Sequence, residues 1–130
     1  MLIIDSSAWI ELIGGTEKGK KVLGLIENNS TFAMTLNLAE VVKWCEKNGK
    51  DGRRAAEAIL EMTEDLLAPS FDALVLGGRL AASTSKGRRT AHKSISIIDC
   101  LLAATANENQ LRVLTSDRDF ERLGCEAIIL

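Results

Sequence analysis

Short apolar runs alternate along the chain with longer segments of helical periodicity, and this alternation constrains the fold more than any other feature. The first run, Leu2–Ile4, ends at an acid followed by two serines, where a helix can begin. Strands that alternate with helices are typical of a parallel sheet covered on both faces. We therefore predict an α/β fold with three layers, α/β/α, around a central, largely parallel sheet. Further strands are expected at Thr31–Thr35, Leu67–Ala68, Leu111–Leu114 and Ala127–Leu130.

Capping residues and apolar periodicity place the helices between these strands. One helix follows Asp5, and Thr16, Asn37 and Ser70 are expected to cap the second, third and fifth helices. The remaining expected bounds are Asp51–Leu66, Phe71 to about Ser83, Ser94 or Ser96 through Asn107, and Asp117–Leu123. The stretch Thr84–Lys93 is rich in turn formers and is predicted to be a loop. Because the chain has no repeat and no linker, residues 1–130 are expected to form a single domain.

Composition and charge exclude several classes of protein. The 130 residues are 46% hydrophobic and 26% charged, which is a globular composition. Sixteen basic and eighteen acidic residues leave a net charge of −2, which argues against nucleic-acid binding through bulk positive charge. No apolar stretch reaches the roughly 18 residues of a membrane helix, and no secretory signal is evident, so we expect a cytoplasmic protein. Cys45, Cys100 and Cys125 form no C-x-x-C pair and are expected to be reduced core thiols.

Acidic residues follow two of the predicted strands. Asp5 comes directly after the first, and Asp117 and Asp119 follow Leu111–Leu114. Ligands of parallel α/β sheets gather at the carboxyl ends of the strands, where these three acids are expected. Asp99 lies within an otherwise apolar helix, where an ionised carboxylate is costly unless it is paired or bound to a cation. Glu40 is expected near the N-terminus of its helix, where the helix dipole favours a negative charge.

Each acid also has a structural explanation. Asp5 and Asp117 could be helix N-caps, and Glu40 could complete a capping box with Asn37. Asp99 could form a buried salt bridge, for which the candidate partners are Arg79 and His92. A functional role is favoured because separate segments bring four carboxylates toward one edge of the same sheet.

The chemistry of such a carboxylate cluster points to a divalent cation. Like charges raise one another's pKa values, so several carboxylates cannot stay ionised together unaided. With no histidine or cysteine cluster available, an all-oxygen ligand set suits Mg²⁺ or Mn²⁺. These ions polarise phosphoryl oxygens and activate water, so hydrolysis of a phosphodiester is the reaction that we expect.

Four motifs stand out along the chain: IIDSSAWIEL, LNLAEVV, SIIDCLLAATA and VLTSDRDFERLG. In their order and approximate spacing they resemble the PIN-domain family, and within it most of all the VapC-type toxins of prokaryotic toxin–antitoxin pairs. The resemblance extends from Met1 to the C-terminus. It implies a Mg²⁺- or Mn²⁺-dependent endoribonuclease that hydrolyses RNA, forms a homodimer and is inhibited by a VapB-like antitoxin.

The resemblance also implies roles for individual residues. Asp5, Glu40, Asp99 and Asp117 match the family's catalytic and metal-binding acids, and Asp119 matches a further acid whose use as a direct ligand varies. Asp5, Asp99 and Asp117 would hold one cation, and Glu40 would bind the same ion or a second one. Glu40 or Asp117 would also help to deprotonate the attacking water. Ser6 and Thr115 match hydroxyl positions of the family. These hydroxyls would not bind the cation directly but would form hydrogen bonds to the acids or to a water bound to the cation.

Two other features have a functional and a structural interpretation. The segment 14–21 approaches the phosphate-loop pattern but has Lys21 where the pattern needs a hydroxyl, so we expect a solvated loop. Residues 73–98 hold five basic groups and no acid. They are an RNA-contacting rim, a docking surface for an acidic partner, or an ordinary solvated loop. The RNA-binding candidates in this segment are Lys86, Arg88, Arg89 and Lys93.

Two alternatives to a ribonuclease remain open at this point. One is a degenerate PIN-like domain that binds RNA or protein without cutting, against which the complete acidic set argues. The other is a metal-dependent nuclease that acts on DNA, which the sequence does not distinguish.

Overall fold

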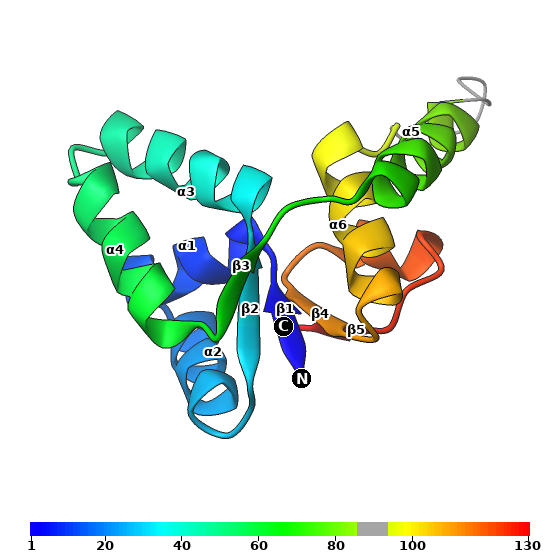
Figure 1. Ribbon diagram of the computed structural model, residues 1–130. Coiled ribbons are helices and arrows are strands. Elements are labelled where there is room, and N and C mark those ends of the chain that lie inside the picture. Colours follow the sequence, from blue (N-terminus) through cyan, green and yellow to red (C-terminus); the bar gives the residue numbers. More distant parts are fainter. Residues whose placement is uncertain (86–93) are drawn as a thin grey trace.

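The computed structural model describes residues 1–85 and 94–130 and has three layers, with helices on both faces of a parallel sheet (Figure 1). The five strands of the described residues lie in the order β3-β2-β1-β4-β5, and neighbouring strands are parallel. The predicted α/β/α fold is thereby confirmed. The strands are β1 (Leu2–Ile4), β2 (Thr31–Met34), β3 (Asp65–Leu67), β4 (Arg112–Thr115) and β5 (Ala127–Ile129).

Helices α1 to α4 gather on one side of the sheet and α5 and α6 on the other (Figure 1). Their bounds are α1 (Ser6–Gly14), α2 (Glu17–Glu27), α3 (Thr35–Lys47), α4 (Gly52–Met62), α5 (Phe71–Ser85) and α6 (Ile97–Glu108). A short 3₁₀ helix, η1 (Arg118–Arg122), follows β4. In the described ranges, no helix combines the length and the apolar character needed to cross a membrane.

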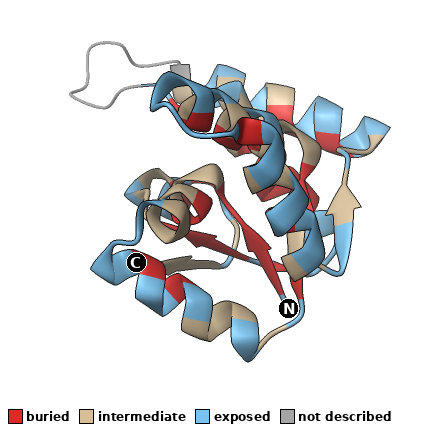
Figure 2. Cartoon of the chain, turned by 90° about the vertical axis from the view of Figure 1, so that its left-hand side faces the viewer, coloured by how far each residue is buried: buried red, intermediate tan, exposed pale blue. Residues whose placement is uncertain are grey.

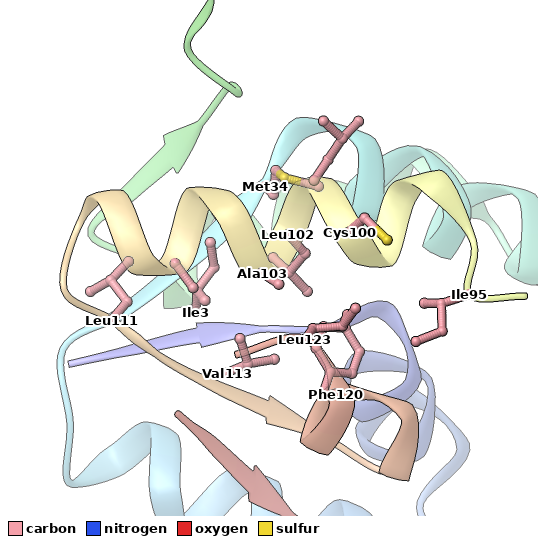
Figure 3. Close-up of a cluster of buried hydrophobic side chains, with 12 residues drawn as sticks. Ile3, Met34, Ile95, Cys100, Leu102, Ala103, Leu111, Val113, Phe120 and Leu123 are labelled. Carbon is pink, nitrogen blue, oxygen red and sulfur yellow. The ribbon is translucent and has the colours of Figure 1, made fainter. Parts of the chain in front are cut away.

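Each face of the sheet has its own apolar core because strand side chains alternate between the faces. Ile3 of β1 packs with α6, β4 and η1, in a cluster that includes Leu102, Val113 and Phe120 (Figure 3). Its neighbours Leu2 and Ile4 pack on the opposite face with α1 to α4. The strands β1, β2 and β4 are buried over most of their length (Figure 2). The carboxyl edge of the sheet is therefore fixed from both sides.

Several predicted bounds need correction. Asn37 does not cap α3, because that helix already begins at Thr35 after Met34, and Asn37 lies buried inside it. The fourth helix ends at Met62 and not at Leu66, since Asp65–Leu67 pairs with β2 as a strand. This strand replaces the predicted one at Leu67–Ala68. The predicted loop Thr84–Lys93 is wrong at its start, where α5 continues to Ser85, and residues 86–93 lie outside the described residues.

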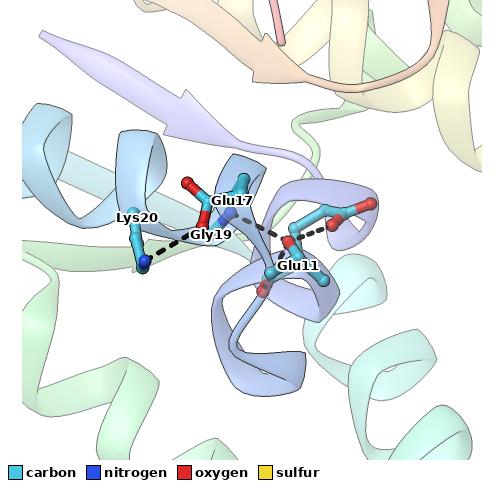
Figure 4. Close-up of polar contacts among 5 residues, drawn as sticks. Glu11, Glu17, Gly19 and Lys20 are labelled. Atoms are coloured by element: carbon cyan, nitrogen blue, oxygen red, sulfur yellow. Dashed lines mark hydrogen bonds and ion pairs between the residues drawn. The ribbon is translucent and has the colours of Figure 1, made fainter.

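The segment that approaches the phosphate-loop pattern is a helix junction and not a solvated loop. Thr16 caps α2 by accepting a hydrogen bond from the Gly19 amide at 3.0 Å, and its hydroxyl also donates to the Glu11 carboxylate. Figure 4 shows Glu11 of α1 and Gly19 of α2 at this junction. Gly19 is buried against α1, where an added Cβ would come within 2.8 Å of the Glu11 carbonyl carbon. Glycine at position 19 thus permits the close contact between α1 and α2.

We expect Gly19→Ala to lower the free energy of unfolding by about 1–3 kcal/mol, because the new methyl group overlaps the α1 backbone. Gly24→Ala is the matched control on the same helix, since a Cβ at position 24 meets nothing within 4 Å. It should raise stability by up to about 1 kcal/mol through helix propensity. Urea unfolding measures both changes, and equal effects would contradict the proposed role of Gly19.

Candidate functional site

The predicted acids lie where two adjacent strands lead to helices on opposite faces. Strands β1 and β4 are neighbours although they are far apart in sequence, and the Asp5 amide donates to the Leu114 carbonyl at 2.9 Å. From β1 the chain continues to α1 on one face, whereas α6 precedes β4 on the other. Such a change of direction in strand order opens a crevice at the carboxyl edge of the sheet, where ligands of α/β proteins bind. Asp5 follows β1 and Asp117 follows β4 by two residues.

Asp5 is buried, with 3% of its surface exposed, and neutral groups hold its carboxylate. Ser7 Oγ and Thr115 Oγ1 donate to Oδ2 at 2.6 and 2.8 Å, and Asn37 Nδ2 donates to Oδ1 at 3.2 Å. Although Asp5 occupies the N-cap position of α1, its side chain makes no capping hydrogen bond. The capping explanation of Asp5 is therefore wrong, and the carboxylate is directed to the crevice network instead.

Glu40 lies beside Asp5 through shared hydrogen-bond donors. Ser6 Oγ donates to Glu40 Oε1 at 2.9 Å and lies 3.4 Å from Asp5 Oδ1. Asn37 Nδ2 lies 3.3 Å from the same Glu40 oxygen, so one amide group connects the two carboxylates. Because Asn37 is not a cap, the capping-box explanation of Glu40 also fails.

Two residues of this network, Asn37 and Ser7, were missing from the sequence-based candidates. Asn37 is fully buried, and its Oδ1 has no hydrogen-bond partner among the described residues, so its donor group alone holds it. Ser7 joins the two strands, since its hydroxyl contacts Asp5 and accepts from the Ser116 amide at 3.0 Å. The signal for Asn37 was its position three residues before Glu40, which places both on one helix face.

Asp117 joins the network through backbone and hydroxyl contacts. Its amide donates to Thr115 Oγ1 at 2.9 Å, and Thr115 in turn donates to Asp5. The Asp117 carboxylate accepts from the Asp119 amide at 2.8 Å, so the capping explanation of Asp117 is confirmed and is compatible with a second role. Asp119 is more peripheral, because its carboxylate lies 3.7 Å from the Arg122 guanidinium with 43% of the side chain exposed.

Asp99 interacts electrostatically with Asp5, Glu40 and Asp117. It lies half-buried in the first turn of α6, which Ser96 caps. Burial raises the pKa of Asp99 to about 7, with further contributions from the charges of Asp5, Asp117 and Glu40 and a smaller opposing one from a Ser96 hydrogen bond. The salt-bridge explanation finds no support in the described residues, where Asp99 has no cationic partner within 4 Å. Arg79 is exposed, and His92 lies outside the described residues.

The chemistry of this donor set fits a hard divalent cation. Apart from the Asn37 amide, the converging groups are carboxylates and hydroxyls, and the charges of Asp5, Asp117 and Glu40 add to burial in raising the pKa of Asp99. Within residues 1–85 and 94–130, however, no three acidic, histidine or cysteine side chains are close enough to form a preassembled metal site. The four acids are therefore close enough for their charges to interact, but their side chains are not arranged as the ligands of a metal ion.

The other sequence candidates lie apart from this network or outside the description. Lys86, Arg88, Arg89 and Lys93 are not among the described residues. Cys45 and Cys100 are buried free thiols, and Cys125 is a half-buried one. Burial raises the pKa of all three thiols, so the thiol form is favoured, as expected for structural cysteines.

The pKa of Asp99 predicts a pH-dependent stability of the metal-free protein. Its folded pKa of about 7 lies above the unfolded value of 3.8, so the folded state binds this proton more tightly. The contribution to the free energy of unfolding is full below about pH 4 and is lost as the pH rises to about 7. We expect Asp99→Asn to unfold at a higher temperature than the parent in EDTA at about pH 8, with the advantage shrinking toward pH 5. Asp72→Asn, an exposed acid on α5, is the control, and identical pH profiles for Asp99→Asn and the parent would contradict the prediction.

Comparisons with known proteins identify the family and several structures of similar fold. A profile of the PIN domain matches residues 2–124. The structure of VapC20 from Mycobacterium tuberculosis, described as a Sarcin-Ricin loop cleaving toxin, superposes with a TM-score of 0.72 over 100% of both chains at 14% identity. FitAcB from Neisseria gonorrhoeae gives a TM-score of 0.74 at 19% identity, covering 98% of this chain and 96% of the other.

A third similar structure is a toxin–antitoxin complex from Klebsiella pneumoniae. Its TM-score is 0.73 at 16% identity, with 98% of this chain and 96% of the other covered. No curated protein sequence matches the chain. At these identities the solved structures show a shared fold, and the profile match confirms the family resemblance seen in the four motifs. The chain therefore belongs to the PIN domain family.

Proposed function

We propose that this protein is a metal-dependent endoribonuclease, that residues 1–130 form a single nuclease domain, and that it is the toxin of a VapBC-type toxin–antitoxin pair in the cytoplasm. One observation carries the catalytic part of the proposal. Shared hydrogen-bond partners link Asp5 to Glu40 and to Asp117, although the three acids come from separate segments, and their charges add to burial in raising the pKa of the half-buried Asp99. A cluster of acids with uncompensated charge is common at functional sites because it serves chemistry at the expense of stability.

In this proposal Asp5, Asp99 and Asp117 would hold one Mg²⁺ or Mn²⁺ ion, and Glu40 would bind the same ion or a second one. Asp119 is a further candidate ligand, which we rank below the other four because its carboxylate lies near Arg122. The cation would supply a Lewis acid for the charge that develops on the phosphoryl oxygens.

In the proposed reaction, some residues of the chain fix the catalytic carboxylates in place and others accept a proton. Ser7, Thr115 and Asn37 fix the Asp5 carboxylate, and Ser6 fixes that of Glu40. Glu40 or Asp117 would accept a proton from the attacking water as its oxygen bonds to phosphorus. The P–O bond of the phosphodiester would then break, and the leaving oxygen would take up a proton from solvent. Because the donors that hold Asp5 among the described residues are neutral, its carboxylate would be available to a cation.

The structural relatives support the substrate and partner parts of the proposal. VapC20 is described as cleaving the Sarcin-Ricin loop, which is an RNA target. The Klebsiella pneumoniae structure contains an antitoxin, and VapBC2 from Rickettsia felis is bound to a promoter DNA fragment. We infer that this chain likewise cleaves RNA and binds a VapB-like antitoxin.

We expect the purified protein to cleave total RNA with Mg²⁺ or Mn²⁺ and to lose this activity in EDTA. Asp5→Asn should lower the cleavage rate by more than roughly a hundredfold, because loss of an outer-shell group alone typically costs 10–100-fold. The fold of this variant should persist, since the Ser7 and Thr115 hydroxyls can accept hydrogen bonds as well as donate them. Gel analysis of RNA, with circular dichroism of each variant, measures both effects.

Three results would contradict this assignment. Cleavage by Asp5→Asn at the parental rate would remove the acid from the mechanism. Failure of the parent to bind Mn²⁺ in calorimetry, or equal binding by Asp99→Asn, would favour a domain that binds without cutting. Cleavage of DNA in place of RNA would assign the other nuclease class.

We also propose a homodimer, which an exposed apolar face of α5 supports. Phe71, Leu74 and Val75 lie at helical spacing with 78%, 50% and 36% of their surfaces exposed. Apolar patches of this kind usually contact another protein surface. Phe71→Glu should convert a dimer into a monomer in light scattering, whereas Leu60→Glu, an isolated exposed leucine on α4, should not. A dimer unaffected by Phe71→Glu would place the interface elsewhere.

A further inference from the structure

A cavity of about 500 Å³ opens beside the acidic crevice. Ser6 and Glu40 of the acidic network form one side of it. Ile98, the residue before Asp99, lies on another side, so the cavity is bounded by the helices that carry Glu40 and Asp99. Its volume falls within the roughly 300–1,000 Å³ of small-molecule and cofactor sites. The remaining wall is mostly apolar and consists of Ile10, Leu36, Ala39, Trp44 and the stems of two lysines.

The two lysines are the positive charges of this cavity. Lys43 and Lys47 are four residues apart on α3, so they lie on one helix face, and both are exposed. Neither makes a salt bridge with any residue in the described ranges. A free lysine pair next to four acids supplies attraction for a polyanion that the acids would otherwise repel.

Trp44, which lies between these two lysines in the sequence, gives the cavity a flat apolar surface. Its side chain is half-buried, in contrast to Trp9, which is fully buried in the core. An aromatic ring beside cationic groups is the arrangement by which proteins bind single-stranded nucleic acids, through base stacking and phosphate contacts. A nucleotide base, which is flat and largely apolar, matches the Trp44 ring, and the anionic phosphates that flank it match the two lysines.

We propose that this cavity is a nucleotide subsite, in which a base next to the cleaved phosphodiester stacks on Trp44 while Lys43 and Lys47 bind flanking phosphates of the RNA. The subsite rests on the proposed ribonuclease function and adds to it a means of choosing the cleaved sequence. Neither lysine nor Trp44 takes part in the bond-breaking step. They act on the position of the strand relative to the acids.

Binding is tested with the Asp99→Asn protein and a short oligoribonucleotide pool of randomised sequence. The RNA should quench the fluorescence of Trp44, because Trp9 is shielded from solvent and ligand. Trp44→Ala should weaken binding roughly tenfold and Trp44→Phe much less, since phenylalanine keeps a stacking surface. The double variant Lys43→Ala/Lys47→Ala should reduce the slope of log affinity against log salt by about 1.4, the loss of two phosphate contacts on a single strand.

The matched control is Lys18→Ala/Lys21→Ala, which removes two exposed lysines of α2 that do not line the cavity. This control should keep the parental salt slope. In the otherwise unmodified enzyme, mapping of cleavage sites in total RNA should show a changed sequence preference for Trp44→Ala and an unchanged one for the control.

The possible results separate the subsite from the proposed function. If the enzyme cuts RNA but the Trp44 and lysine variants keep its site preference and salt slope, the subsite is wrong and the ribonuclease assignment stands. If no cation supports cleavage but the RNA still quenches Trp44 with the expected slope, the subsite stands and the catalytic proposal fails. If an acidic peptide containing leucine and phenylalanine quenches Trp44 and RNA does not, the cavity takes a protein segment and the nucleotide proposal is overturned.

Discussion

The buried carboxylate of Asp5 is the interaction on which the site depends. It is ionisable and almost fully enclosed, and donors from α1, α3 and β4 hold it, with no salt bridge to any cationic side chain of residues 1–85 and 94–130. Burying a charge without a counter-ion costs several kcal/mol unless hydrogen bonds replace its water, and these donors supply that replacement. Because they come from separate segments, the carboxylate also ties α1 and α3 to the end of β4.

The same arrangement places the negative charges of Asp5, Glu40 and Asp117 near Asp99. Asp99 is exposed to this charge, and its pKa near 7 reflects burial together with repulsion by the three other acids. A proton on Asp99 relieves this repulsion, and a divalent cation bound as proposed would relieve it as well. The two apolar cores on opposite faces of the sheet stabilise the helices that hold the acids in place.

The fold and most of the candidate acids could be predicted because they depend on local patterns. The strand at Leu2–Ile4 and the caps at Thr16, Ser70 and Ser96 followed from apolar runs and capping residues. Asn37 was misassigned, since asparagine is a common cap and its partner Asp5 lies 32 residues away in sequence. The end of the fourth helix was missed for a related reason, because pairing of Asp65–Leu67 with β2 overrides local helical periodicity.

By itself, the sequence determined the alternation of strands and helices, the family motifs and the position of each acid at a strand end or in a helix. These follow from periodicity and residue type, which act over a few neighbouring residues. Only the tertiary structure decided that Asn37 connects Asp5 to Glu40, that Asp119 contacts Arg122, and that Trp44 and two lysines line a cavity beside the acids. The reason is physical: hydrogen bonds and electrostatic repulsion depend on distances between segments, and the packing of α1, α3 and α6 around the sheet sets those distances.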